Sequence, residues 1–198
     1  LGQNFLIDKN IIEKIINITN IENKIVLEIG PGTGSLTSFI LKKKPKKIIV
    51  IEKDNELAIN LKDKFNNQLI IVNDDVLKIN ETSLFNDKVI VFGNLPYNIS
   101  TEILTKWIIN LKDKFWFESL ILMFQKEVAD RIIAEFNTSN YGRLSIISNW
   151  KLNIKKVFDI KPGAFSPKPK IDSSLLFFQP KKKFIKINDP NNLEKVTR

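Results

Sequence analysis

The stretch that decides the fold runs from Val26 to Gly34 and reads VLEIGPGTG. Its first four residues are apolar except for Glu28 and predict a buried strand. A glycine-rich turn follows, and then Leu36, Phe39 and Ile40 recur at helical spacing. A strand, a glycine turn and a helix in this order open a nucleotide-binding α/β unit, because glycines let the backbone come close to a ligand.

The spacing of the glycines narrows the choice of ligand. Gly30, Gly32 and Gly34 form Gly-x-Gly-x-Gly, which differs from the Gly-x-Gly-x-x-Gly of dinucleotide-binding proteins. The Lys-Ser/Thr pair of a P-loop is also missing from the turn. Both points favour a ligand without a pyrophosphate, and S-adenosylmethionine fits that description. Glu28 either holds the turn or reaches the methionine amine, and we favour the structural role, in which it accepts backbone N–H bonds.

Further strands and helices alternate along the chain. We expect strands at 25–29, 47–51, 69–72, 89–92, 120–124, about 154–160 and 175–178, and helices at 11–18, 36–43, 55–65, 101–110, 127–135 and 144–150. This alternation predicts an α/β fold with a mostly parallel seven-stranded sheet and helices on both faces. Only a loop separates the last two strands, which allows the final strand to be antiparallel.

Polar residues stand where the predicted strands end. Ligands of parallel sheets bind at the carboxyl ends of the strands, and Gly30, Glu52, Asp75 and Asn94 all fall there. Glu52 is placed to accept both ribose hydroxyls of the cofactor. Asp75 closes the run Asn73-Asp74-Asp75 and is placed to read the adenine amine of the cofactor.

The segment FGNLPYNIS, residues 92–100, carries a second chemistry. The 6-amino group of adenine is a poor nucleophile because its lone pair is spread into the ring. Two hydrogen-bond acceptors, the side-chain oxygen of Asn94 and the carbonyl of Leu95, can draw its protons out of the ring plane. Pro96 fixes the turn, and Tyr97 offers a face for stacking. Taken alone, the tetrapeptide is explained equally well as a proline turn after a core strand.

Composition favours an anionic partner. The 198 residues suffice for one domain with a substantial core. The net charge of +9 suits nucleic acid, although a codon bias toward Lys, Asn and Ile also raises it. Arginine occurs only at Arg131, Arg143 and Arg198. Lysine binds phosphate as a point charge and reads base edges less well than arginine, so the charge indicates backbone attraction.

The chain has no Cys and no His. This excludes a thiolate attack on a pyrimidine, an iron–sulfur cluster, a His or Cys zinc site and any disulfide. We expect no metal. No apolar run reaches transmembrane length and no signal-peptide pattern opens the sequence, so no membrane association is expected.

Taken together, the motifs resemble the ribosomal RNA adenine dimethyltransferase family, and most closely its small-subunit branch of the kasugamycin-resistance type. The resemblance covers nearly the whole chain. Its motifs are LGQNFL (1–6), EIGPGTG (28–34), the strand ends at Glu52 and Asp75, FGNLPYNIS (92–100), FQKEVADRI (124–132), YGRLS (141–145) and FSPKPKIDSS (165–174).

The resemblance implies a Rossmann-like S-adenosylmethionine-dependent methyltransferase fold and a function. That function is dimethylation of the 6-amino group of adjacent adenines in small-subunit (16S-type) ribosomal RNA, with a role in ribosome biogenesis and the small ribosomal subunit as partner. It also implies site residues. The cofactor site is lined by Asn4, Leu6, Gly30, Glu52, Asp75 and Asn94. The target adenine is held by Asn94, Leu95 and Tyr97, with Phe165 as the second stacking aromatic; burial of Phe165 under its loop is the alternative.

The resemblance also bears on extent and setting. We expect residues 1–180 to form the catalytic domain and 181–198 a linker and the start of a truncated C-terminal helical domain, because Asp189 and Pro190 form a helix start. A monomer in the cytoplasm is expected, or an organellar protein if a targeting peptide precedes this fragment.

Three alternatives stay open. The first is a large-subunit methyltransferase of the erythromycin-resistance type, against which the Leu of Asn-Leu-Pro-Tyr and the QKEVADR segment speak. The second is a DNA adenine methyltransferase. The third is a non-catalytic RNA-binding assembly factor or transcription factor on the same fold.

Overall fold

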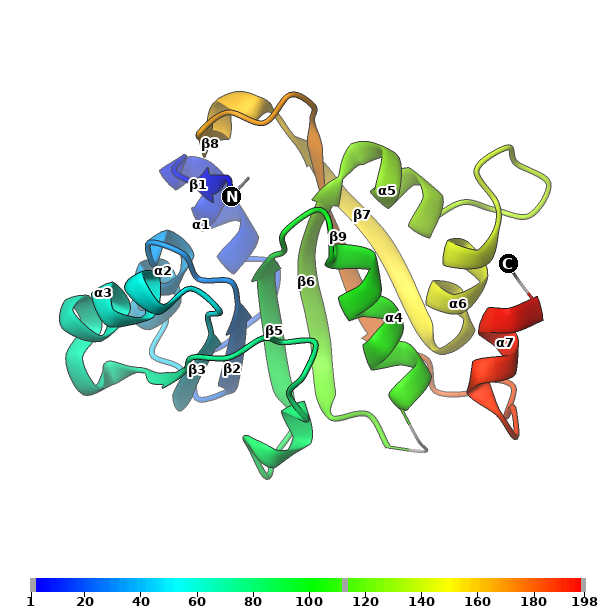
Figure 1. Ribbon diagram of the computed structural model, residues 1–198, viewed down its shortest axis with the longest axis horizontal. Coiled ribbons are helices and arrows are strands. Elements are labelled where there is room, and N and C mark those ends of the chain that lie inside the picture. The colour runs from blue at the N-terminus through cyan, green and yellow to red at the C-terminus, as the bar shows by residue number, and fades with distance from the viewer. Residues whose placement is uncertain (1–2, 112–113, 197–198) are drawn as a thin grey trace.

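The computed structural model describes residues 3–111 and 114–196. A seven-stranded sheet in the order β4-β3-β2-β5-β6-β9-β7 forms its centre, with helices on both faces (Figure 1). The strands of this sheet are β2 (Ile25–Ile29), β3 (Lys47–Ile51), β4 (Ile70–Val72), β5 (Val89–Asn94), β6 (Phe117–Gln125), β7 (Leu152–Ile160) and β9 (Ser173–Pro180). The predicted α/β class and seven-stranded sheet are confirmed.

The direction of the strands follows the expected pattern. Strands β4, β3, β2, β5 and β6 are mutually parallel. Strand β9 pairs antiparallel with β6 on one side and with β7 on the other, so it lies between these two strands although it follows both in the sequence. The register pairs Ile29 with Ile51 and with Gly93, and so the residues that follow β2, β3 and β5 meet at one edge.

Alternation of apolar side chains gives the sheet two cores. Val26 and Ile90 face a cluster covered by α1 (Lys9–Ile16), α2 (Ser35–Lys42) and α3 (Asn55–Phe65). Leu27 and Val91, each one residue further along its strand, face the opposite cluster, because successive side chains of a strand point to opposite faces. Both faces are thus apolar, as a sheet covered on both sides requires.

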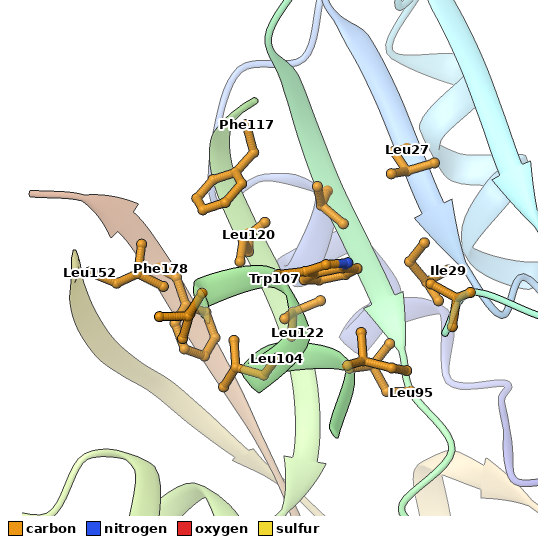
Figure 2. Packing of buried hydrophobic residues seen from close by; sticks show 14 of the residues in the cluster. Leu27, Ile29, Leu95, Leu104, Trp107, Phe117, Leu120, Leu122, Leu152 and Phe178 are labelled. Carbon is orange, nitrogen blue, oxygen red and sulfur yellow. The ribbon is translucent and has the colours of Figure 1, made fainter. Parts of the chain in front are cut away.

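The second core lies under α4 (Ser100–Asn110), α5 (Lys126–Ile132) and α6 (Arg143–Lys151). Figure 2 shows Trp107 of α4 amid the side chains of Leu120 and Leu122 of β6. The indole N–H of Trp107 donates to the carboxylate of Glu81 over 2.7 Å, in the short 3-10 helix Glu81–Ser83. This bond fastens the segment between β4 and β5 to α4.

A second, two-stranded sheet was not predicted. Strand β1 (Phe5–Leu6) pairs antiparallel with β8 (Phe165–Ser166), and the Ile7 N–H donates to the Ala164 carbonyl over 2.8 Å. β8 follows a 3-10 helix at Pro162–Ala164. The opening motif of the chain is therefore held beside the FSPKPKIDSS segment, near the top of Figure 1.

The helix predictions are accurate within a few residues. The largest difference is α5, which ends at Ile132 instead of residue 135. Asp8 and Asp54 begin α1 and α3 by accepting backbone N–H bonds with their carboxylates. A 3-10 helix at Asn66–Gln68 follows α3. Helix α7 (Pro190–Val196) starts where expected and packs against the core through Leu193. The division of the chain at residue 180 stays a prediction.

Candidate active site

A cavity lies at the carboxyl edge of the parallel strands, where the sequence placed the site. The ends of four strands, β2, β3, β4 and β5, line it together with the N-terminal segment that leads into β1. Its lining residues are Gln3, Asn4, Phe5, Ile29, Gly30, Gly32, Ile51, Glu52, Lys53, Asp74, Asp75, Val76, Asn94, Leu95, Pro96, Tyr97 and Ile99.

The glycine turn after β2 lines the cavity through Gly30 and Gly32. Gly30, Gly32 and Gly34 have φ angles of +64°, +57° and +77°, the left-handed region that side chains disfavour. A Cβ on Gly32 would lie 2.7 Å from the Phe5 ring, and one on Gly34 2.5 Å from the Phe65 ring. The turn therefore needs glycine both for its backbone angles and for its close packing.

Glu52 stands at the end of β3 and is only 4% exposed. Its carboxylate accepts the Gly32 N–H over 3.1 Å and the Asp54 N–H over 3.0 Å, one on each oxygen. A carboxylate offers about four acceptor positions. Glu52 can therefore fix the glycine turn and still accept hydroxyl groups of a ligand in the cavity.

Asp75 follows β4 and also lines the cavity. Its carboxylate accepts Lys53 Nζ over 2.9 Å and the Leu77 N–H over 3.0 Å. The hydrogen bond from Lys53 is the main cause that lowers the pKa of Asp75, with the Leu77 N–H next. Asp75 is therefore a carboxylate at neutral pH and an acceptor only, as the reading of an amine requires.

Asn94 ends β5, and its amide is oriented by the chain's N-terminal segment. The side-chain Nδ2 donates to the backbone carbonyl of Asn4 over 2.8 Å. A carbonyl accepts and cannot donate, so the amide nitrogen must face Asn4 and Oδ1 remains the acceptor. The sequence analysis predicted Asn4 and Asn94 as separate site residues. In the structure a hydrogen bond connects them, and Asn4 takes part in it through its backbone carbonyl.

Leu95 and Tyr97 occupy the next positions of the loop. The Leu95 side chain is 1% exposed and points into the core (Figure 2), so any contact with a substrate amine falls to its carbonyl. The Tyr97 ring is half-buried, and its hydroxyl lies 2.6 Å from the Ser173 hydroxyl. Burial raises the pKa of the Tyr97 phenol, which keeps it protonated.

Two of the predicted residues lie elsewhere. Leu6 is 4% exposed and lines a smaller neighbouring cavity with Glu28, Gly30 and Asn94. Phe165 is 1% exposed and belongs to the core that α1, α2 and α3 cover, and it is not among the residues that line the main cavity. Of the two sequence expectations for Phe165, burial under the loop is found here, because pairing of β8 with β1 turns the ring inward. Stacking by Phe165 stays a prediction that requires this loop to move. Leu1 and Gly2 of the opening motif lie outside the described residues.

Glu28 is buried at 1% exposure beside the glycine turn. Its carboxylate accepts the Thr37 hydroxyl of α2 over 2.7 Å, instead of the backbone N–H bonds expected from the sequence. Burial, with a smaller contribution from the like charge of Glu52, raises the pKa of Glu28 to about 7. Glu28 thus ties β2 to the helix that the glycine turn begins.

Sequence reasoning missed Lys53, Phe5 and Ser173. Ser173 lies in the FSPKPKIDSS motif, but nothing in that motif indicates that it meets Tyr97, 76 positions earlier. Within residues 3–111 and 114–196 no group of His, Cys, Asp and Glu is arranged to bind a metal. In the same part of the chain, no helix combines the length and the apolarity that crossing a membrane demands.

Solved structures of similar shape agree with this geometry. A dimethyladenosine transferase from Plasmodium falciparum superposes with a TM-score of 0.79 at 34% identity, covering 90% of this chain and 64% of that one. The 23S rRNA methyltransferase ErmE gives a TM-score of 0.75 at 25% identity, covering 97% and 75%. The fold and the site define an S-adenosylmethionine-dependent methyltransferase of the Rossmann-like class.

Sequence comparison assigns the family. The family model of ribosomal RNA adenine dimethylases matches residues 1–198. The ribosomal RNA small subunit methyltransferase A of Pelagibacter ubique (strain HTCC1062) is 68% identical over 198 residues, which are 100% of this chain and 76% of the relative. The protein of the same name from Mycoplasma mobile is 44% identical over 194 residues, covering 98% and 72%. The chain belongs to the ribosomal RNA adenine dimethylase family.

Proposed function

We propose that this chain transfers two methyl groups from S-adenosylmethionine to the 6-amino group of each of two adjacent adenines in small-subunit ribosomal RNA. The observation that carries the proposal is the orientation of Asn94. Its amide nitrogen is held by the Asn4 carbonyl, and its oxygen is left to accept from an amine. This acceptor lines the same cavity as Glu52 and Asp75, the two carboxylates suited to a nucleoside cofactor.

The polar groups that line the cavity fit the cofactor. The left-handed glycine turn admits a close ligand, Glu52 has spare acceptor positions for ribose hydroxyls, and Asp75 is an acceptor for an adenine amine. When bound, S-adenosylmethionine supplies an already activated sulfonium methyl group.

The chain's own task is to make the target amine nucleophilic and to place it. The Asn94 Oδ1 and the Leu95 carbonyl accept hydrogen bonds from the two N–H groups of the amine and thereby localise the nitrogen lone pair. Productive transfer needs the reacting atoms about 3–3.5 Å apart and in line. Stacking of the base on Tyr97 contributes roughly 1–3 kcal/mol to holding it there.

Proton transfer needs no side-chain base in this scheme. The chain has no histidine, and the raised pKa of Tyr97 keeps its phenol protonated. After methyl transfer the product amine is acidic and releases its proton to water. An adenine stacked inside a helix cannot enter the cavity, so the substrate base must be extruded or come from a loop.

The net charge of +9 supports attraction to the ribosomal RNA backbone before the base is engaged. We propose that the chain acts as a monomer in the cytoplasm, or in an organelle if a targeting segment precedes it. The small ribosomal subunit is the proposed partner.

A second candidate substrate is large-subunit RNA, which the similarity to ErmE favours. One experiment separates the two. Purified unmethylated small and large ribosomal subunits are incubated with methyl-labelled S-adenosylmethionine, and the RNA is digested to nucleosides. We expect label in dimethyladenosine from the small subunit only. Label confined to the large subunit would overturn the proposal in favour of the alternative.

A further inference from the structure

The tetrapeptide Asn94–Tyr97 is held by groups outside it. The Asn94 amide is fixed by Asn4, and the Tyr97 carbonyl accepts the Ser100 hydroxyl over 3.1 Å at the start of α4. These two bonds place the backbone of the loop and the acceptor oxygen. Neither controls the ring of Tyr97, whose face is the part that meets the base.

Ser173 supplies the missing restraint. Its hydroxyl lies 2.6 Å from the Tyr97 hydroxyl, and this contact reaches from the loop after β5 across the end of β6 to β9. A phenol bound at its far end cannot swing about its side-chain torsions without breaking the bond. The orientation of the stacking face is therefore tied to the sheet.

The anchor itself is rigid. Ser173 is fully buried and begins β9, where it is paired with Gln125 of β6 and with Ile160 of β7. The backbone carbonyl of the preceding residue, Asp172, accepts the Lys126 N–H over 2.9 Å, and its carboxylate forms an ion pair with Lys161 over 2.6 Å. Movement at Tyr97 therefore has to come from the loop and not from the strand.

We propose that Ser173 is a positioning residue for the methyl transfer and acts only through the Tyr97 hydroxyl to fix the ring against which the target adenine stacks. This inference rests on the proposed function, because it assigns the ring to the substrate base. Loss of one such hydrogen bond changes an equilibrium roughly 2- to 12-fold. The effect falls on the RNA substrate and leaves cofactor binding unchanged, since Ser173 does not line the cofactor cavity.

The neighbouring residue provides a matched control. Ser174 is also fully buried on β9, but its hydroxyl donates to Asp159 over 2.6 Å, away from Tyr97. Ser173→Ala and Ser174→Ala remove the same atom from adjacent positions of one strand. A loss that came merely from weakening β9 would appear in both variants.

The test is a double-mutant cycle of Ser173→Ala and Tyr97→Phe, with kcat/KM measured on small-subunit RNA. Each single variant should lose roughly 2- to 12-fold, and the double variant should lose no more than either, because the same bond is removed. Ser174→Ala should match the wild type. At equal total methyl transfer, both bond-breaking variants should leave more monomethyladenosine, since the second transfer needs the base held in the same place.

Additive losses in the double variant, or a Tyr97→Phe variant with wild-type kcat/KM and product ratio, would overturn the inference. If Ser173→Ala does not fold, Tyr97→Phe decides alone, because it removes the bond without touching β9. Affinity for an oligoadenylate in the presence of S-adenosylhomocysteine gives a readout without methyl transfer. Absence of label from the wild type would count against the proposed function, whereas equal oligoadenylate affinity of all variants would count against Ser173.

Discussion

Replacing Glu28 with Gln should stabilise the protein at alkaline pH. Glu28 is buried at 1% exposure, and its pKa is raised to about 7 from the ordinary 4.5. Between these two values the folded state binds more protons than the unfolded chain. The free energy of unfolding therefore falls as the pH rises through this window and levels off above pH 7.

The size of the effect follows from the shift. The pKa moves by 7 − 4.5 = 2.5 units, and at about 1.36 kcal/mol per unit the charged carboxylate costs about 3 kcal/mol above pH 7. A Gln side chain keeps the shape and still accepts the Thr37 hydroxyl through its oxygen. Its buried NH₂ group costs about 1 kcal/mol if it lacks a partner. The net gain for Glu28→Gln at pH 8 is thus about 2 kcal/mol.

Urea unfolding at pH 5, 6, 7 and 8 measures this. The difference between variant and wild type should grow from pH 5 to pH 7 and then stay constant. Glu22→Gln, at an exposed position, serves as control and should follow the wild type at each pH. Curves for Glu28→Gln and wild type that stay parallel from pH 5 to pH 8 would refute the reasoning. A loss of cofactor affinity in Glu28→Gln would instead assign Glu28 to the methionine amine.

Three further predictions concern the cavity and its supports. Asn94→Ala should lower the rate of single-turnover methyl transfer about 10²- to 10³-fold, as loss of one polarising group does, while calorimetry should find the cofactor affinity little changed. Near-normal turnover would show that Asn94 does not polarise the target amine. The hydrogen bond from Lys53 lowers the pKa of Asp75, so the carboxylate is charged throughout pH 5–8 and the cofactor affinity should be constant over this range. Asp75→Asn should weaken cofactor affinity about tenfold, because its amide presents N–H donors to the adenine amine. Equal affinity of the wild type and Asp75→Asn would contradict this. Lys106 donates to the Val76 and Ile79 carbonyls and to Glu81. Lys106→Met should therefore lower the free energy of unfolding by about 3 kcal/mol, because it leaves a buried carboxylate without its cation, whereas Lys24→Met, which breaks an exposed ion pair, should cost less than about 1 kcal/mol. Similar losses in both variants would show that burial of the ion pair does not matter here.

Much of the fold was predictable because local signals were consistent. The run Ile25–Ile29 and the glycines after it gave a strand, a turn and a helix, and all three were found. The same holds for the helix at Asn55–Phe65, which has an Asp cap before it. Helix ends were less certain, as α5 shows, because tertiary packing and not propensity decides where the last turn stops.

The site was predictable where it depends on strand ends. Gly30, Glu52, Asp75 and Asn94 lie at one edge because parallel strands present their carboxyl ends together. Of the two expectations for Phe165, the structure shows the buried ring, and its stacking on a base stays a prediction. The buried ring accompanies the pairing of β1 with β8, in which Leu6 lies opposite Phe165, and no local pattern reveals a contact between segments so far apart in the sequence.

The sequence by itself determined the sheet, the helices on its two faces, the glycine turn and the residue types at the strand ends, because these depend on periodicity and backbone preference within short segments. Only the tertiary structure decided how those side chains are held. Asn94 is oriented by the backbone of Asn4, Tyr97 by Ser173, and the loop after Asp75 by Lys106. Each of these bonds joins residues at least 30 positions apart, and such contacts are fixed by packing of the whole chain and not by the neighbours in sequence.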